Sequence, residues 1–493
     1  MYLLFIFFNF MIFIFCSLFG RFLGARGINY LVIYSTILNS LLVFFIFKEV
    51  ILMDSYCYID IMNWINFDLL DINWSFYFDK LTVIMCILVS IVSNLVNIYS
   101  LEYMEHDAHK VRFISYLYLF SFFMIVLITS SNLVELFVGW EGVGICSYLL
   151  INFWYSRLQA NKSAIFAVIV NKISDFFILL SFGLFYYTYH SLDFSLILVS
   201  SNYEISNLFY NDLICLLLLL GAVGKSAQVG LHFWLPEAME GPTPVSALIH
   251  AATMVTAGVF LIVRFFFIFQ QSIICLILMG LFGCISAFFA GLLSIFLFDL
   301  KKIIAFSTCS QLGYMFVSCS FYNDSYAIFH LFTHGFFKAL LFLSAGYLIH
   351  ALNDEQDIRR YGGLLKIFPY YYIVMLIGSF SLMGLPFFSG FFSKEPLIES
   401  LFINYYYYSD IQIYRYFYFI KIVTFFSILF TIIYSFRLIF YLFFYDYNGQ
   451  KINLINLHYC GDYIDFALFN LAILSMILGF FFYYYFNFIY ISC

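Results

Sequence analysis

Charged residues are scarce in this chain of 493 residues. Only 10% of its residues are Asp, Glu, Lys or Arg, whereas 64% are hydrophobic and the mean hydropathy is +0.97. A water-soluble fold of this size would have too few polar residues to cover its surface, so a soluble protein is excluded. We expect the chain to lie in a membrane, where unpaired backbone groups are so costly that its apolar runs must be helices.

Other features are also missing, and each absence removes a class of function. The net charge of −6 is spread thinly over short loops without a basic tract, so binding to nucleic acid is not expected. The eleven cysteines include no C-x-x-C pair, which argues against a disulfide framework or an iron–sulfur site. There is no G-x-G-x-x-G or P-loop motif, so chemistry on NADH, flavin or quinone would belong to partner chains.

Long apolar runs dominate the sequence instead. A helix needs about 20 apolar residues to cross the hydrocarbon core, and roughly fourteen such runs are present. This predicts an all-α polytopic membrane protein. The spans are expected at residues 3–19, 28–53, 78–101, 112–130, 132–154, 163–189, 211–235, 243–269, 273–298, 302–322, 325–350, 368–406, 414–446 and 463–491. The acidic, Trp-bearing segment 54–79 alternates in polarity, which predicts an interfacial hairpin or extended segment covering one membrane face.

Proline interrupts two of these runs, at Pro236 and at Pro386. Because proline removes one helical hydrogen bond, Pro236 is expected to close the helix that carries Lys225. The carbonyl groups of His232 and Leu382 should then be free. Broken helices at matching places in two halves of a membrane protein indicate structural repeats and a transport site. The expected regions are an N-terminal part (1–111), two inverted five-helix repeats (112–269 and 273–446) and a C-terminal span (447–493).

Ionisable residues lie inside the predicted spans. A charge in the middle of a membrane is costly, so each such residue is a functional hypothesis by default. Glu141 has no cation in its own span, and Lys225 is its nearest candidate partner along the sequence. His330, His334 and Lys338 follow one another at spacing i, i+4 and i+8, which places three ionisable side chains along one face of the helix predicted at 325–350. The candidates for carrying a proton are Glu141, Lys225, His250, His330, His334, Lys338 and Lys394.

Each candidate also has a purely structural interpretation. The lysines could extend toward the membrane surface, and the other groups could be satisfied core residues. His330 and His334 have the H-x-x-x-H spacing that could suggest zinc, whereas two residues on one helix face cannot bind opposite faces of one haem. No metal is expected, however, because the Glu of H-E-x-x-H and a third ligand are absent. Lys172 and Asp175 are expected to form a structural i, i+3 pair. Glu135 is expected to be a charge at the membrane interface.

Five long motifs occur in order along the chain and resemble one family. They are WEGVGICSYLL (140–150), the run from 221 to 264, DLKKIIAFSTCSQLGYM (299–315), FHLFTHGFFKALLFLSAG (329–346) and LPFFSGFFSKE (385–395). From about 75 to 480 the sequence resembles the largest antiporter-like subunit, subunit 5, of respiratory complex I, the mitochondrial NADH:ubiquinone oxidoreductase. The resemblance implies a proton-translocating subunit of the inner mitochondrial membrane. Its neighbours would be lipids and other membrane-arm subunits, above all the adjoining antiporter-like subunit, and NADH, FMN, iron–sulfur clusters and ubiquinone would be bound by partner subunits.

The resemblance also implies roles for the candidates. Glu141 and Lys225 would form an ion pair, His250 and Lys338 a connecting relay near His330 and His334, and Lys394 a terminal charged site. Members of the family usually continue into a long lateral helix, whereas this sequence ends at Cys493. We therefore expect that helix to be lost or carried by another chain. A stand-alone cation/proton antiporter and a purely architectural subunit remain the alternatives.

Overall fold

The computed structural model describes residues 1–67, 70–203, 208–403, 411–450 and 461–489. Within these residues, 11 helices are long and apolar enough to cross a membrane. The number is smaller than the roughly fourteen runs of the prediction, because one helix covers the first two runs and two broken runs form shorter pieces. The predicted ends of the spans 368–406 and 463–491 lie outside the described residues. An all-α polytopic architecture is confirmed.

The chain divides into two compact units, which are described separately. Unit 1 contains residues 1–225 and 260–275, and unit 2 contains residues 226–259 and 276–493. The helices α10 (Thr256–Arg264) and α12 (Ile273–Phe296) belong to both. The other elements of unit 1 are α1 (Tyr2–Phe47), η1 (Lys48–Leu52), β1 (Cys57–Phe67), β2 (Leu70–Phe78), α2 (Lys80–Tyr103), α3 (Lys110–Thr129), α4 (Leu133–Ile151), η2 (Asn152–Trp154), α5 (Leu158–Tyr189), α6 (Phe194–Tyr203), α7 (Leu208–Lys225) and α11 (Phe266–Phe269).

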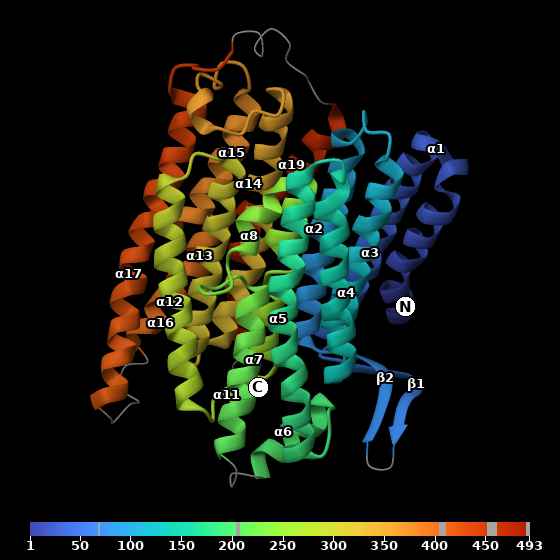
Figure 1. Cartoon of the computed structure of the whole chain (residues 1–493), viewed down its shortest axis with the longest axis vertical. Coiled ribbons are helices and arrows are strands. Elements are labelled where there is room, and N and C mark those ends of the chain that lie inside the picture. The colour runs from blue at the N-terminus through green and yellow to red at the C-terminus, as the bar shows by residue number, and fades with distance from the viewer. Residues whose placement is uncertain (68–69, 204–207, 404–410, 451–460, 490–493) are drawn as a thin grey trace. The chain divides into compact units, whose positions relative to one another are not determined.

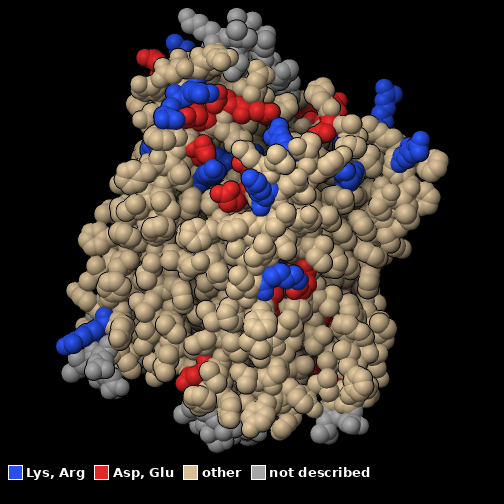
Figure 2. All heavy atoms as spheres, viewed as in Figure 1, with Lys and Arg blue, Asp and Glu red and all other residues tan. Residues whose placement is uncertain are grey.

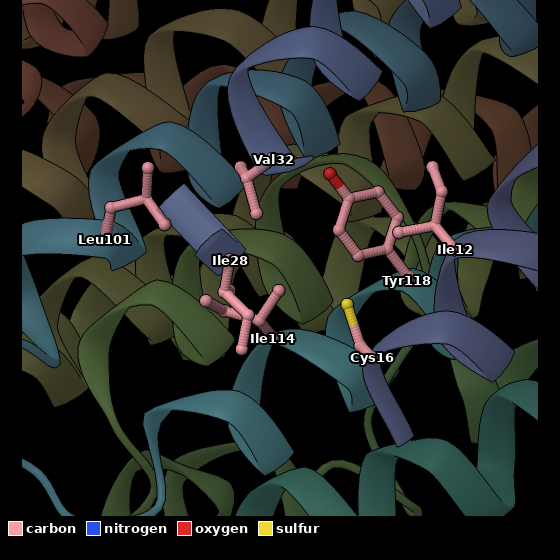
Figure 3. Packing of buried hydrophobic residues seen from close by; sticks show 7 residues of the cluster. All are labelled: Ile12, Cys16, Ile28, Val32, Leu101, Ile114 and Tyr118. Atoms are coloured by element: carbon pink, nitrogen blue, oxygen red, sulfur yellow. The ribbon is translucent and has the colours of Figure 1, made fainter. Parts of the chain in front are cut away.

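Helix α1 is two arms joined at a break. Gly24 has φ 63° and ψ −176°, a conformation that glycine adopts without the penalty of a side chain. The arms correspond to the first two predicted spans. Figure 3 shows how residues of both arms pack with residues of α2 and α3 in one buried core. This core contains Ile12, Cys16, Ile28, Val32, Leu101, Ile114 and Tyr118.

The predicted hairpin at 54–79 is confirmed. Strand β1 pairs with β2 in an antiparallel ladder, and the rings of Trp64 and Trp74 meet with centroids 5.0 Å apart. The side-chain amide of Asn132 holds strand β2 by donating to the carbonyl of Asn73 at 2.8 Å. In Figure 1 the hairpin and α6 lie at the same end of the helices of unit 1.

Unit 2 is built around one helix that is buried on all sides. In helix α14 (Asp324–Ala351), every residue from Ala327 to Ile349 is buried. Its polar residues therefore face protein rather than lipid. The other elements of this unit are α8 (Trp234–Glu237), η4 (Ala238–Glu240), α9 (Thr243–Ala247), η5 (Leu248–Ala252), α13 (Leu300–Ser320), η6 (Ile358–Arg360), α15 (Pro369–Met383), α16 (Ser389–Ile403), α17 (Ile411–Ile439), η8 (Phe440–Phe444) and α19 (Asp462–Ile489).

Candidate functional site

The first helix break begins at Lys225, well before Pro236. Helix α7 ends at Lys225, and left-handed conformations follow at Ala227 (φ 51°) and Gly230 (φ 106°). Pro236 lies in the short helix α8, so the expectation that it closes the Lys225 helix is wrong. The carbonyl of His232 is not free either, because the backbone N–H of Leu235 donates to it at 3.1 Å. The break is made by backbone conformation rather than by proline.

Lys225 is held by Trp140 of α4. Its side chain is buried, and Nζ donates to the carbonyl oxygen of Trp140 at 2.9 Å and lies 5.2 Å from the centroid of the indole ring. A Cβ atom at Gly144 would lie 3.3 Å from Nζ, so this glycine makes room for the amine. The indole N–H of Trp140 donates to the buried carboxylate of Asp175 at 2.6 Å. Trp140 therefore connects an amine of α7 with a carboxylate of α5.

Glu141 forms its ion pair with Lys172 of α5, not with Lys225. Lys172 accordingly does not form the expected i, i+3 pair with Asp175, whose carboxylate is bonded to Trp140. Adjacent residues of a helix point about 100° apart, so Trp140 can face α7 while Glu141 faces outward toward α5. The pair lines a cavity of about 230 Å³ between α4 and α5.

The Glu141–Lys172 pair is unusual for its position. The Lys172 side chain is 54% exposed, although the pair lies on two helices that can span a membrane. Figure 2 shows that most of the surface drawn is uncharged and that Lys, Arg, Asp and Glu side chains occupy only small parts of it. An ion pair at the surface of the spans is therefore an exception that requires a function or a covering partner.

The stripe on α14 is present as predicted. His330, His334 and Lys338 lie one turn apart and are almost completely buried. The two ring nitrogens of His330 lie 3.0 Å from Ser393 Oγ and 3.2 Å from Gln311 Oε1. Lys338 donates from Nζ to the hydroxyl of Ser307 at 2.5 Å. The rings of His334 and His330 lie 6.2 Å apart, so the stripe is continuous along the helix.

Sequence reasoning missed the contribution of helix α13. Ser307 and Gln311, which bond to Lys338 and His330, are one turn apart on this helix. Tyr314 continues the same face, and Nζ of Lys394 lies 5.3 Å from the centroid of its ring. The sequence did contain the pattern that predicts this polar face, because Ser307, Gln311 and Tyr314 lie at spacing i, i+4 and i+7 inside an apolar run.

The second helix break holds Lys394. Helix α15 ends at Met383, Gly384 takes φ 82°, and α16 begins at Ser389. Nζ of Lys394 donates to Thr431 Oγ1 at 3.1 Å and to the carbonyl of Leu382 at 3.4 Å. The prediction that the carbonyl of Leu382 is freed for a polar partner is confirmed.

His250 lies in the π-helical segment η5, inside a predicted span. Its ring is buried, and within the described part of the chain neither ring nitrogen makes a hydrogen bond. The ring centroid lies 6.0 Å from that of Trp234 and 6.2 Å from that of Phe342, which follows Lys338 by one turn on α14. A π-helical segment within a helix is frequently found at a functional site.

Glu135 lies in the first turn of α4, near the end of a candidate span, as a charge of the interface would. It is fully buried, which the sequence did not suggest, and neither carboxylate oxygen has a hydrogen-bond partner among the described residues. Its backbone N–H donates to the side chain of Asn132, which caps the helix. Within the described ranges, no three His, Cys, Asp or Glu side chains come together as ligands of a metal would.

Two family models match this chain. Residues 130–413 match the family model described as NADH:quinone oxidoreductase/Mrp antiporter, TM, and residues 64–114 match that of NADH-Ubiquinone oxidoreductase (complex I), chain 5 N-terminus. NADH-ubiquinone oxidoreductase chain 5 of Acanthamoeba castellanii is 48% identical over 480 residues, which cover 96% of this chain and 70% of that protein. The protein of the same name from Chondrus crispus is 48% identical, over 94% of this chain and 70% of its own length.

Two solved structures have a similar fold. A chain of the membrane-bound sulfane sulfur reductase, an archaeal respiratory membrane complex, gives a TM-score of 0.83 at 20% identity, and the match covers 98% of this chain and 95% of that one. A chain of the Mrp complex from Dietzia sp. DQ12-45-1b gives a TM-score of 0.82 at 23% identity, over 96% of this chain and 49% of its own length. At such identities the likeness concerns the fold alone.

Proposed function

Because the chain belongs to the family of NADH-ubiquinone oxidoreductase chain 5, it is a proton-translocating membrane subunit of that enzyme, and we propose that its buried charged side chains carry the proton. The redox chemistry takes place elsewhere in the enzyme: NADH, FMN, iron–sulfur clusters and ubiquinone are bound by partner subunits. The chain works in the inner mitochondrial membrane beside other membrane subunits, among them a neighbouring antiporter-like subunit.

The observation that carries this proposal is a series of three separate hydrogen-bonded groups in unit 2. The first joins Lys338 to Ser307, and the second joins His330 to Gln311 and Ser393. The third is formed by Lys394, the residue after Ser393 in the sequence, which donates to Thr431 and to the carbonyl of Leu382. Hydroxyl and imidazole groups can both accept and donate a proton, so they can connect two amines that exchange one.

The Trp140 contacts give unit 1 a site of the same kind. Lys225 has the Trp140 carbonyl as an acceptor whether its amine is charged or neutral, and Asp175 and Glu141 are the carboxylates on the neighbouring helices. At an effective dielectric of about 20, two charges attract by roughly 4 kcal/mol at 4 Å and roughly 2.4 kcal/mol at 7 Å. A movement of a few ångströms between an amine and a carboxylate is therefore enough to release or capture a proton.

The test is substitution of Lys338 in the assembled enzyme, reconstituted in sealed vesicles. We expect Lys338→Met to lower the number of protons moved per NADH oxidised. Lys421→Met is the matched control, because Lys421 also lies on a spanning helix of unit 2 but packs on the ring of Phe402, outside the series. An unchanged ratio in Lys338→Met would contradict the proposal and favour an architectural subunit.

A separate measurement addresses the antiporter alternative. The isolated chain in vesicles is exposed to a sodium gradient, and proton movement is followed without NADH. We expect no sodium-dependent proton flux, because the proton path depends on redox energy from partner subunits. Sodium-driven flux that is lost in Lys225→Met would instead support a cation/proton antiporter.

A further inference from the structure

Arg264, at the end of α10, has an incomplete set of hydrogen bonds. Its guanidinium carbon lies 5.5 Å from the ring centroid of Tyr77 and 5.3 Å from that of Phe194, and its side chain is only 9% exposed. Nη1 donates to the carboxylate of Asp79. Nε and Nη2 have no acceptor among the residues that the structure describes. A buried guanidinium with two unused donors indicates a missing partner.

The two unused donors define the chemistry of that partner. The N–H groups of Nε and Nη2 point the same way from one edge of the guanidinium, and this fork matches two oxygen atoms of one phosphate or carboxylate group. The rings of Tyr77 and Phe194 lie next to the guanidinium, and its Nη1 is fixed by the carboxylate of Asp79. A single water molecule could not satisfy both donors as well as an oxyanion does.

A cavity of about 400 Å³ is lined in part by Arg264. The hairpin lines it with Tyr58 and Tyr77, and the start of α6 lines it with Asp193, Leu198 and Val199. Its walls are tied together by backbone hydrogen bonds from Phe194 N to Ser131 O and from Leu133 N to Leu192 O, both 3.1 Å long. The site is therefore formed before a ligand binds.

The position of the cavity is the boundary of the apolar spans. Arg264 is the last residue of one candidate span, and Asp79 caps the first turn of another. Two apolar side chains on α6, Leu198 and Val199, are 47% and 53% exposed beside the cavity. An oxyanion with apolar chains attached to it, at the edge of a membrane, is a phospholipid.

We propose that this cavity binds the headgroup of a zwitterionic phospholipid, with the phosphate on the Arg264 fork, the amine toward Asp193 and the acyl chains along α6. An anionic headgroup fits less well, because the cavity lining contains two carboxylates, Asp79 and Asp193, and one cation. Burial, and to a smaller extent the charge of Asp60, raises the pKa of the Asp193 carboxyl. A ligand ammonium beside Asp193 would favour its ionised form.

The experiment uses phosphatidylethanolamine with a photoreactive acyl chain, added to the purified oxidoreductase in mild detergent. We expect the label on the α6 peptide, and Arg264→Lys should lower it about tenfold, because a lysine keeps the charge but loses the fork. The matched control is Arg437→Lys. Arg437 also packs on aromatic rings, 5.1 Å from Phe298, but it donates to the carbonyls of Ser294 and Leu297.

Competition separates the possible sources of the phosphate group. Unlabelled phosphatidylethanolamine should remove the label at low concentration, phosphatidylglycerol only at higher concentration, and inorganic phosphate not at all. Equal competition by inorganic phosphate would mean a free-anion site and would overturn the proposal. Unchanged labelling in Arg264→Lys would also overturn the proposal. The same holds if the wild-type enzyme takes up no label because a carboxylate of a partner subunit occupies the site.

A second variant keeps the test valid if Arg264→Lys fails to assemble. Asp193→Asn leaves the phosphate fork intact and removes the partner of the amine. We expect it to retain the label but to lose the preference for phosphatidylethanolamine over phosphatidylglycerol. An unchanged preference would overturn the proposed orientation of the headgroup.

Discussion

Lys225 donates a hydrogen bond from Nζ to the backbone carbonyl of Trp140 at 2.9 Å. The acceptor belongs to the main chain, so it cannot be removed by substitution of a side chain and does not titrate. The same Trp140 donates from its indole N–H to Asp175 at 2.6 Å. One residue of α4 therefore holds a basic and an acidic group on two other helices, and its side chain and its backbone can be tested separately.

Trp140→Phe separates these two roles. Phenylalanine keeps an aromatic ring and the carbonyl for Lys225, but the buried carboxylate of Asp175 loses its donor. Loss of a hydrogen bond to a buried charged group costs about 1–3 kcal/mol. We expect fewer protons per NADH and a lower melting temperature of the purified enzyme.

Trp154→Phe is the control for this change. It removes a comparable bond, from the indole N–H of Trp154 to Asp107 at 3.2 Å, outside the proposed site. It should leave the number of protons per NADH unchanged. An equal effect of the two substitutions would show that Trp140 has no special role.

The Glu141–Lys172 pair can be tested with a double-mutant cycle. We expect Glu141→Gln and Lys172→Met each to lower the rate of proton translocation, because each leaves one charge on a spanning helix without its partner. The double variant should lose less than the product of the two single effects, with a non-additivity of about fivefold in rate. The comparison pair is Lys302 and Asp299, which are 3.2 Å apart and whose side chains are 33% and 44% exposed. Additive effects at Glu141 and Lys172 would contradict a functional pair.

Much of the fold could be predicted because hydropathy alone determines where a chain crosses lipid. The spans, the hairpin at 54–79 and the buried stripe of α14 all follow from composition and spacing. The free carbonyl of Leu382 follows from proline chemistry. These features depend on residues that are close together in the sequence.

The errors concern features that depend on backbone conformation or on contacts between helices. The first break lies at Lys225 because Ala227 and Gly230 adopt left-handed conformations, and only the glycine could have suggested this. The pairing of Glu141 with Lys172 depends on how α4 is rotated against α5, which hydropathy does not determine. The burial of Glu135 was not predicted, because the residues that exclude solvent from it belong to other segments of the chain.

Ser307→Ala tests the contribution of α13. The substitution removes the hydroxyl that accepts from Lys338, and the buried amine is left without this acceptor. We expect a lower rate of proton translocation at an unchanged amount of assembled enzyme, and recovery in Ser307→Thr. Ser318→Ala is the control, since Ser318 is a buried serine of the same helix whose hydroxyl donates to the carbonyl of Met315. If Ser307→Ala translocates protons at the normal rate, the series does not pass through α13.

Thr431→Val tests how Lys394 is held. Valine has nearly the shape of threonine, so Lys394 loses its acceptor at 3.1 Å and keeps the carbonyl of Leu382 at 3.4 Å. The bond that the Thr431 hydroxyl donates to the carbonyl of Ile428 at 2.7 Å is lost as well. With one of its two acceptors gone, Lys394 should lose about 1 kcal/mol of stabilisation, which corresponds to a roughly fivefold lower rate of proton translocation. Lys394→Met should lower the rate further.

Thr424→Val is the matched control for this change. Thr424 is also buried on α17, and its hydroxyl likewise donates to a carbonyl of its own helix, that of Lys421 at 2.8 Å. It lacks only the contact with Lys394. A rate lowered equally by both valines would trace the effect to helix packing. A rate lowered only in Thr431→Val would show that the second break works through the hydrogen bonds of its lysine.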